Sequence, residues 1–230
     1  MLTTRPYDDD HLNEECAIFG IFGNDEAAAH TALGLHALQH RGQEATGIVA
    51  FDGFQFRNHR DAGHVGDVFG SEETIRGLPG PMAIGHNRYA TTGGAASRNI
   101  QPLFAEFAFG GFAIAHNGNL TNAASLRRDL VLQGSLFQST TDTEVFIHLI
   151  ARSKANNLVD RLIDAMQQVE GAYSLVALSQ KKLIGVRDRH ALRPLVLGRL
   201  GQAWIQRRRP ARSTSSAPSS CATSSPARSS

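Results

Sequence analysis

The chain has 230 residues, of which 41% are hydrophobic and 19% charged, and its formal net charge is +2. This length is enough for one large globular domain. The charge is uneven, because all five charged residues from Gln206 onward are arginines, which leaves 18 basic against 21 acidic residues elsewhere. The positive balance therefore reflects the last segment rather than a nucleic-acid surface, and we expect no nucleic-acid partner.

Cysteine content and hydropathy exclude further classes. Cys16 and Cys221 are the only cysteines, which excludes a disulfide framework and a Cys-rich zinc or iron–sulfur site within this chain. No apolar run approaches the roughly 18 residues needed to cross a bilayer. The acidic first residues lack the basic and apolar regions of a signal peptide. The sequence predicts a cytoplasmic protein with no membrane partner.

Composition divides the chain into three parts. Residues 1–15 are polar and acidic, without apolar periodicity, and are interpreted as a flexible leader. Residues 16–205 alternate short apolar runs with amphipathic segments and form the expected domain. Residues 206–230 are rich in Arg, Ser, Pro and Ala, so we expect a disordered tail.

Within the domain, short apolar runs bounded by Gly, Asp or Ser predict strands. They cover residues 17–22, 45–51, 82–85, 112–116, 173–178 and 183–186. Asp52-Gly53 predicts a two-residue hairpin turn, and residues 179–182 predict another hairpin. Helical spacing covers residues 26–39, 123–133 (ended by Gly134), 143–154 and 158–169. The pattern Thr141-x-x-Glu144 predicts a capping box for the third helix. Strands clustered between helices predict a layered α+β domain.

Polar motifs follow several of these runs. Cys16 starts the first apolar run, where a lone cysteine is more often a buried small hydrophobe. Downstream lie the segments 39–43 (QHRGQ), 85–93 (GHNRYATTG), 116–120 (HNGNL) and 141–144 (TDTE). Each stands where an expected strand or helix meets a loop, the usual place for functional groups on a rigid scaffold.

With the run CAIFGI at residues 16–21, these motifs resemble, in the same order, the glutaminase domain of the amidophosphoribosyltransferase family. The resemblance extends to about Arg199. It implies a four-layer αββα N-terminal-nucleophile hydrolase fold, glutamine as the substrate, and a role in phosphoribosylamine formation, the first step of de novo purine biosynthesis. It also implies no cofactor in this chain, since Mg²⁺ and, where present, an iron–sulfur cluster belong to the phosphoribosyltransferase domain of family members, which are homo-oligomers.

The resemblance implies that residues 1–15 are removed and that the freed amino group of Cys16 serves as the base for its own thiol. A free α-amine titrates at roughly 7.7–8.0 and a thiol near 8.5, so proton exchange between them is feasible near neutral pH. Asn117 and Gly118 are implied to form the oxyanion hole, although Asn-Gly alone is equally typical of a hairpin turn.

The remaining implied site residues bind the substrate. Arg88 clamps the α-carboxylate of glutamine, which a planar guanidinium can do through two parallel hydrogen bonds. Asp142 pairs with the α-ammonium, a role compatible with the preference for acids at helix starts. Thr91 helps to hold the carboxylate, and Arg41 with Gly42 shapes the loop near the nucleophile.

A metal site is not expected. His36 and His40 lie one helical turn apart, but residue 37 is Ala, so the glutamate of the zincin pattern is missing and no third ligand is evident. We interpret the two histidines as helix residues.

Two departures from the family pattern stand out. The loop at residues 187–194 has Ala-Leu where the family usually has Gly-Ile, and a lost glycine strains a turn. After Ile205 the family continues into a phosphoribosyltransferase domain, whereas this chain turns into the Arg/Ser/Pro-rich tail, as a shifted reading frame would produce. Such a truncated chain could hydrolyse glutamine but not complete the transferase reaction. The alternatives are an inert fragment and the glutaminase domain of a sibling such as the hexosamine-forming aminotransferase, whose usual Tyr-Arg-Gly-Tyr is absent here.

Overall fold

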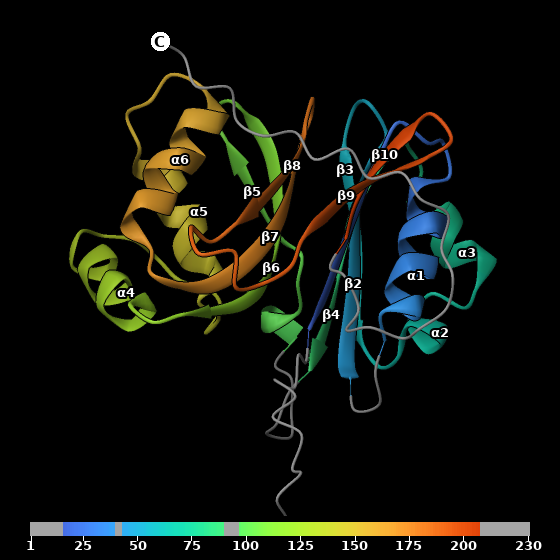
Figure 1. The fold of residues 1–230 in the computed structure, drawn as a ribbon, viewed down its shortest axis with the longest axis horizontal. Coiled ribbons are helices and arrows are strands. Elements are labelled where there is room, and N and C mark those ends of the chain that lie inside the picture. The colour runs from blue at the N-terminus through green and yellow to red at the C-terminus, as the bar shows by residue number, and fades with distance from the viewer. Residues whose placement is uncertain (1–15, 40–42, 90–96, 208–230) are drawn as a thin grey trace, which may run out of the picture.

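A computed structural model describes residues 16–39, 43–89 and 97–207. They form four layers in the order helix, sheet, sheet, helix (Figure 1). The layered α+β prediction is thereby confirmed. None of the helices within the described ranges combines the length and apolar character that a membrane crossing requires.

The first sheet has six antiparallel strands in the order β3-β2-β4-β1-β10-β9. Its strands are β1 (Ala17–Phe22), β2 (Gln43–Phe51), β3 (Phe56–Ala62), β4 (Met82–Tyr89), β9 (Val196–Leu200) and β10 (Ala203–Arg207). β1, the first strand of the domain, lies between β4 and β10. β10 extends two residues beyond the domain limit expected at residue 205, because Arg207 still pairs with Phe19 of β1.

The second sheet has four antiparallel strands in the order β5-β6-β7-β8. These strands are β5 (Leu103–Phe107), β6 (Gly110–Leu120), β7 (Gly171–Ser179) and β8 (Leu183–Arg187). Helices α4 (Ala123–Leu132), α5 (Thr143–Arg152) and α6 (Leu158–Gln168) lie on its outer side, and α1 (Ala27–Ala37) covers the six-stranded sheet (Figure 1). Three short helical segments complete the described fold: α2 (Val65–Val68), α3 (Glu72–Arg76) and η1 (Ser97–Asn99).

Each space between layers is filled by its own apolar cluster. Leu35 of α1 packs with alternate residues of β1, β2 and β4, whereas Phe146 and Ile150 of α5 pack on β6 and β7. A third cluster joins the two sheets face to face: Ile18, Val49, Phe51, Met82, Ile84, Ala113, Ala115, Val176 and Leu178. Because strand side chains alternate between faces, these residues identify which positions of each strand point into the space between the sheets.

The six expected strands and four expected helices are present, with ends shifted by a few residues. The sequence patterns do not predict β5, β9, β10 or the short helices. Two local predictions are wrong. The hairpin after β2 has a four-residue connection, because the Asp52 carboxylate accepts hydrogen bonds from the amides of Phe54 and Gln55 and Phe51 pairs with Phe56. The capping box does not form at α5.

At α5 the carboxylate of Glu144 accepts hydrogen bonds from the Gln138 amide and from the amide and hydroxyl of Ser139. The N-cap residue is Asp142, not Thr141. Glu144 therefore organises the loop before the helix rather than the first turn itself.

Candidate functional site

Cys16 and Arg88 are brought together by the pairing of β1 with β4. In this antiparallel ladder Ala17 lies opposite Asn87, so the next position places Cys16 beside Arg88. Cys16 is partly exposed, directly before the buried strand β1. The nucleophile candidate thus directly precedes β1, and the predicted carboxylate clamp lies one residue before the end of the neighbouring strand β4.

Strand alternation turns these side chains toward a third candidate. Ile18 of β1, Ile84 of β4 and Ala115 of β6 all face the space between the sheets. Stepping by two along each strand puts Cys16, Arg88 and Asn117 on the same facing surfaces. β4 packs against β6 in the fold. The two sheets therefore present a thiol, a guanidinium and a carboxamide to one space at the same end.

Two of these groups have buried nitrogens that receive no hydrogen-bond partner from the part of the chain that the structure describes. Neither Arg88 Nη1 nor Asn117 Nδ2 has a hydrogen-bond partner among the described residues. An unsatisfied buried donor costs about 1–3 kcal/mol, and more when it is charged. Such a cost is typical of groups whose hydrogen-bond partner is a bound ligand. Both N–H donors can bind a ligand that offers oxygen acceptors.

Gly118 is required by the backbone that follows Asn117. Its φ is 141°, a conformation that favours glycine. A Cβ built on it would lie 2.2 Å from the carbonyl oxygen of Ala172 on the neighbouring strand. The Asn-Gly pair belongs to a continuous strand, β6, so the alternative of a hairpin turn is wrong here.

His86 joins the two sheets beside the site. Its Nε2 lies 3.2 Å from the carbonyl oxygen of His116, the residue that directly precedes Asn117 in β6. Burial lowers the pKa of His86 to about 3, helped by the neighbouring His116 and by Arg88 and opposed by the hydrogen bond to His116. The ring is therefore neutral near pH 7 and donates through Nε2.

Asp142 lies at the start of α5, on the side of β6 that faces the helices. One carboxylate oxygen accepts from the Leu120 amide at 3.0 Å, and the other lies 3.5 Å from His116 Nδ1. Burial raises the pKa of Asp142, but the contacts with His116 and with backbone amides outweigh it, so the net shift is downward. The ionised carboxylate has about four lone-pair sites and keeps acceptor capacity beyond these two contacts.

Three predicted residues, Thr91, Arg41 and Gly42, lie outside the described residues, as does His40. His36 lies on the exposed face of α1. Among the described residues, no three His, Cys, Asp or Glu side chains are arranged to hold a metal ion.

Three buried polar residues at the site, His86, Gln101 and Ser174, carry no recognisable role in the sequence motifs. His86 is part of the motif around Arg88, which was a usable signal. Gln101 accepts from the His116 amide at 2.8 Å but stands in a loop without a recognisable pattern. Ser174 pairs with Asn117 across β6 and β7, and its buried hydroxyl has no partner within the described ranges. Only the pairing of the strands reveals it.

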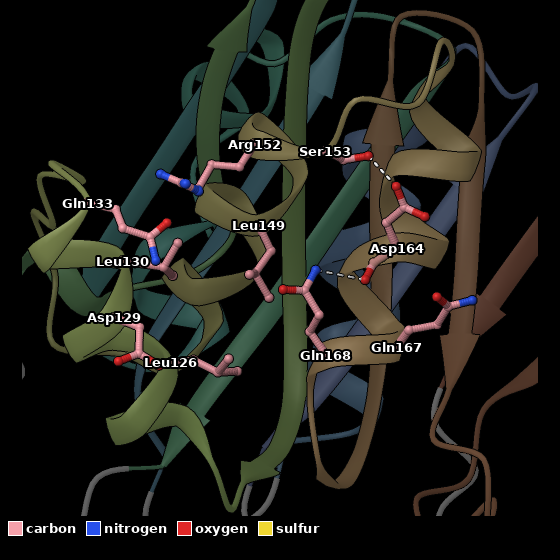
Figure 2. Close-up of a pocket in the computed structure, with 10 residues that line it drawn as sticks. All are labelled: Leu126, Asp129, Leu130, Gln133, Leu149, Arg152, Ser153, Asp164, Gln167 and Gln168. Atoms are coloured by element: carbon pink, nitrogen blue, oxygen red, sulfur yellow. Dashed lines mark hydrogen bonds between the residues drawn. The ribbon is translucent and has the colours of Figure 1, made fainter.

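A separate pocket of 480 Å³ lies among the outer helices α4, α5 and α6 (Figure 2). Asp129, Arg152 and Gln168 are among the residues that line it, and the hydroxyl of Ser153 donates to the carboxylate of Asp164. Of the described residues, neither a cysteine nor a histidine lines this pocket. It therefore offers no thiol nucleophile, in contrast to the space between the sheets.

Comparison with known proteins agrees with this geometry. A family model described as a glutamine amidotransferase domain matches residues 86–206. An amidophosphoribosyltransferase of Rhizobium etli is 57% identical over 198 residues, covering 86% of this chain and 40% of that protein. An amidophosphoribosyltransferase of Lacticaseibacillus casei is 47% identical over 193 residues, covering 84% of this chain and 100% of that sequence.

Solved structures give the same result. The glutamine phosphoribosylpyrophosphate amidotransferase of Bacillus subtilis, complexed with ADP and GMP, superposes with a TM-score of 0.78 at 42% identity. The match covers 84% of this chain and 41% of that one. The chain thus spans about two fifths of the length of these two longer relatives.

Proposed function

Because the chain belongs to the amidophosphoribosyltransferase family, whose glutamine amidotransferase domain it carries, we propose that its site hydrolyses glutamine to glutamate and ammonia. Cys16 is the nucleophile. Removal of residues 1–15 would free its amino group, which then takes the proton of the thiol, and the resulting thiolate attacks the carboxamide carbon. While Glu15 acylates that nitrogen, no such base is available.

The attack places negative charge on the carboxamide oxygen. Asn117 Nδ2, buried and unpaired among the described residues, and the backbone N–H of Gly118 are the donors assigned to it. The tetrahedral intermediate collapses as its C–N bond breaks, and the departing nitrogen, protonated by the α-ammonium of Cys16, leaves as ammonia. Water then attacks the thioester with the same amine as base and releases glutamate.

The amino acid end of glutamine is held by opposite charges. Arg88, whose buried Nη1 has no partner in the described part of the chain, binds the α-carboxylate, and Asp142 binds the α-ammonium. Thr91 supports the carboxylate contact, while Arg41 and Gly42 shape the loop near the thiol. These last three assignments rest on the sequence motifs.

The ammonia has a further use in the complete enzyme. We assign this domain to the supply of ammonia for phosphoribosylamine formation, the first step of de novo purine biosynthesis. This assignment rests on the family, since the chain covers 40% of the Rhizobium relative.

One observation carries the proposal: Ile18, Ile84 and Ala115 face the space between the sheets, and alternation along the same strands turns Cys16, Arg88 and Asn117 toward it. The test compares the full chain with a chain that begins at Cys16, using intact mass to define the N-terminus and ammonia release from glutamine to measure activity. We expect activity only where Cys16 is the first residue.

Cys16→Ala should abolish ammonia release, whereas Cys221→Ala, at the chain's other cysteine, should leave it unchanged. If Cys16→Ala releases ammonia as fast as its parent, the proposed nucleophile is wrong. If a chain that begins at Cys16 is folded but inactive, the glutaminase function itself is refuted for this protein.

A further inference from the structure

We propose that His86 is a positioning residue that fixes the spacing between Arg88 and Asn117 and thereby selects glutamine over shorter amides. The specificity part of this proposal rests on the proposed function. His86 is 1% exposed and faces the space between the sheets, on the same side of β4 as Arg88. Its hydrogen bond to the His116 carbonyl connects a strand of one sheet to a strand of the other.

The bond can form in only one tautomer. A backbone carbonyl accepts but does not donate, so Nε2 must carry the hydrogen. The ring is neutral, which leaves Nδ1 without a proton, and Nδ1 has no partner among the described residues. His86 therefore acts as a single, defined donor to β6.

His116 forms a fixed anchor for that donor. Its amide donates to Gln101 Oε1 at 2.8 Å, and its ring Nδ1 lies 3.2 Å from Thr143 Oγ1 at the start of α5. Contacts on both the main chain and the side chain thus hold the carbonyl in place. β6 cannot easily follow a movement of β4, so the bond from His86 sets the distance between the two strands.

This distance matters because the two strands bind opposite ends of the substrate. Arg88 lies two residues beyond His86, about 7 Å along the strand. Asn117 follows His116 directly. In the proposed function Arg88 holds the α-carboxylate and Asn117 the carboxamide oxygen, which in glutamine are one methylene further apart than in asparagine. A fixed separation between the two strands discriminates between these lengths.

Two substitutions separate the hydrogen bond from the ring. His86→Gln can place an amide N–H near the position of Nε2, whereas the shorter side chain of His86→Asn cannot reach the carbonyl of His116. Both are polar and uncharged near pH 7. We would measure kcat and KM for glutamine and for asparagine in each variant, in the chain that begins at Cys16.

We expect His86→Gln to keep the parent's preference for glutamine over asparagine. His86→Asn should lower that preference at least 10-fold, mainly by raising the KM for glutamine, since one methylene is typically worth about 10–200-fold in discrimination. A structural defect alone would lower both activities in the same proportion and leave the ratio unchanged. An unchanged ratio, or the same ratio in both variants, overturns the specificity role.

A measurement that does not depend on activity tests the bond itself. Nitrogen-15 NMR of the histidine rings should show one neutral ring protonated at Nε2 whose signal disappears in His86→Asn. If the signal of the Nε2-protonated ring is present but glutamine is not hydrolysed, the proposed function and the specificity role are refuted, whereas the hydrogen bond between His86 and His116 is supported. If glutamine is hydrolysed and His86 is protonated at Nδ1, the positioning role is refuted and the function stands.

Discussion

The buried His86 should make the domain sensitive to mild acid. Its ordinary pKa of 6.5 falls to about 3 in the fold, because burial and the nearby His116 and Arg88 disfavour the charged ring. Between these two values the unfolded chain binds a proton that the folded chain does not, so stability is lost as the pH falls from 6.5 toward 3. From pH 7 to pH 5 the linkage relation gives a loss of about 2 kcal/mol from this residue.

His86→Gln retains a donor but cannot titrate, and it is the matched variant for this test. Urea unfolding followed by far-UV circular dichroism at pH 7 and pH 5 gives the free energy of unfolding of each protein. The parent should lose about 2 kcal/mol more than His86→Gln across this interval. Acidic groups such as Asp142 respond in both proteins and cancel in the difference. Equal losses would refute the reasoning that His86 is buried and neutral.

Three backbone positions give further predictions. Gly118→Ala should abolish glutamine hydrolysis and lower the melting temperature, because its Cβ would lie 2.2 Å from the Ala172 carbonyl oxygen; wild-type activity would contradict this. Gly134→Ala at φ 91°, where the added Cβ meets no described residue within 4 Å apart from its chain neighbours, should cost only about 1–2 kcal/mol in urea unfolding and leave activity unchanged. Ala191→Gly should stabilise the domain by up to about 1 kcal/mol, because the strain of Ala191 at φ 55° exceeds the entropy that glycine adds to the unfolded chain, and a lower urea midpoint would count against this explanation.

Three residues that the sequence motifs single out, Cys16, Arg88 and Asn117, lie on or directly before strands that face the same space between the sheets, and their roles there stay predictions. The motifs around Arg88 and Asn117 stand at strand ends, and alternation within a strand is a local property that the structure preserves. The expected strain in the loop at residues 187–194 is confirmed at Ala191, whose φ is positive. These features depend on a few adjacent residues, so a single sequence contains enough information to find them.

The features that the sequence patterns miss depend on partners outside the local pattern. β9 and β10 contain glycine, arginine and glutamine, and they become strands because β10 pairs with β1, almost 200 residues earlier in the chain. Glu144 matches a capping box, yet the amides of the preceding loop compete successfully for its carboxylate. The first case is a long-range pairing that overrides a local preference, and the second is a set of hydrogen bonds from residues just before the helix. Neither contact can be deduced from the spacing of the motif.

The position of β1 between β4 and β10 has a consequence for the order of events during synthesis. β1 gains its second neighbour only when residues 203–207 have left the ribosome, since those residues form β10. Contacts of such wide separation form late, after most of the chain is available. β1, which begins next to Cys16, therefore lacks one of its two neighbouring strands in the nascent polypeptide. Any chemistry that requires a rigidly held thiol becomes possible only after nearly the whole domain has been translated.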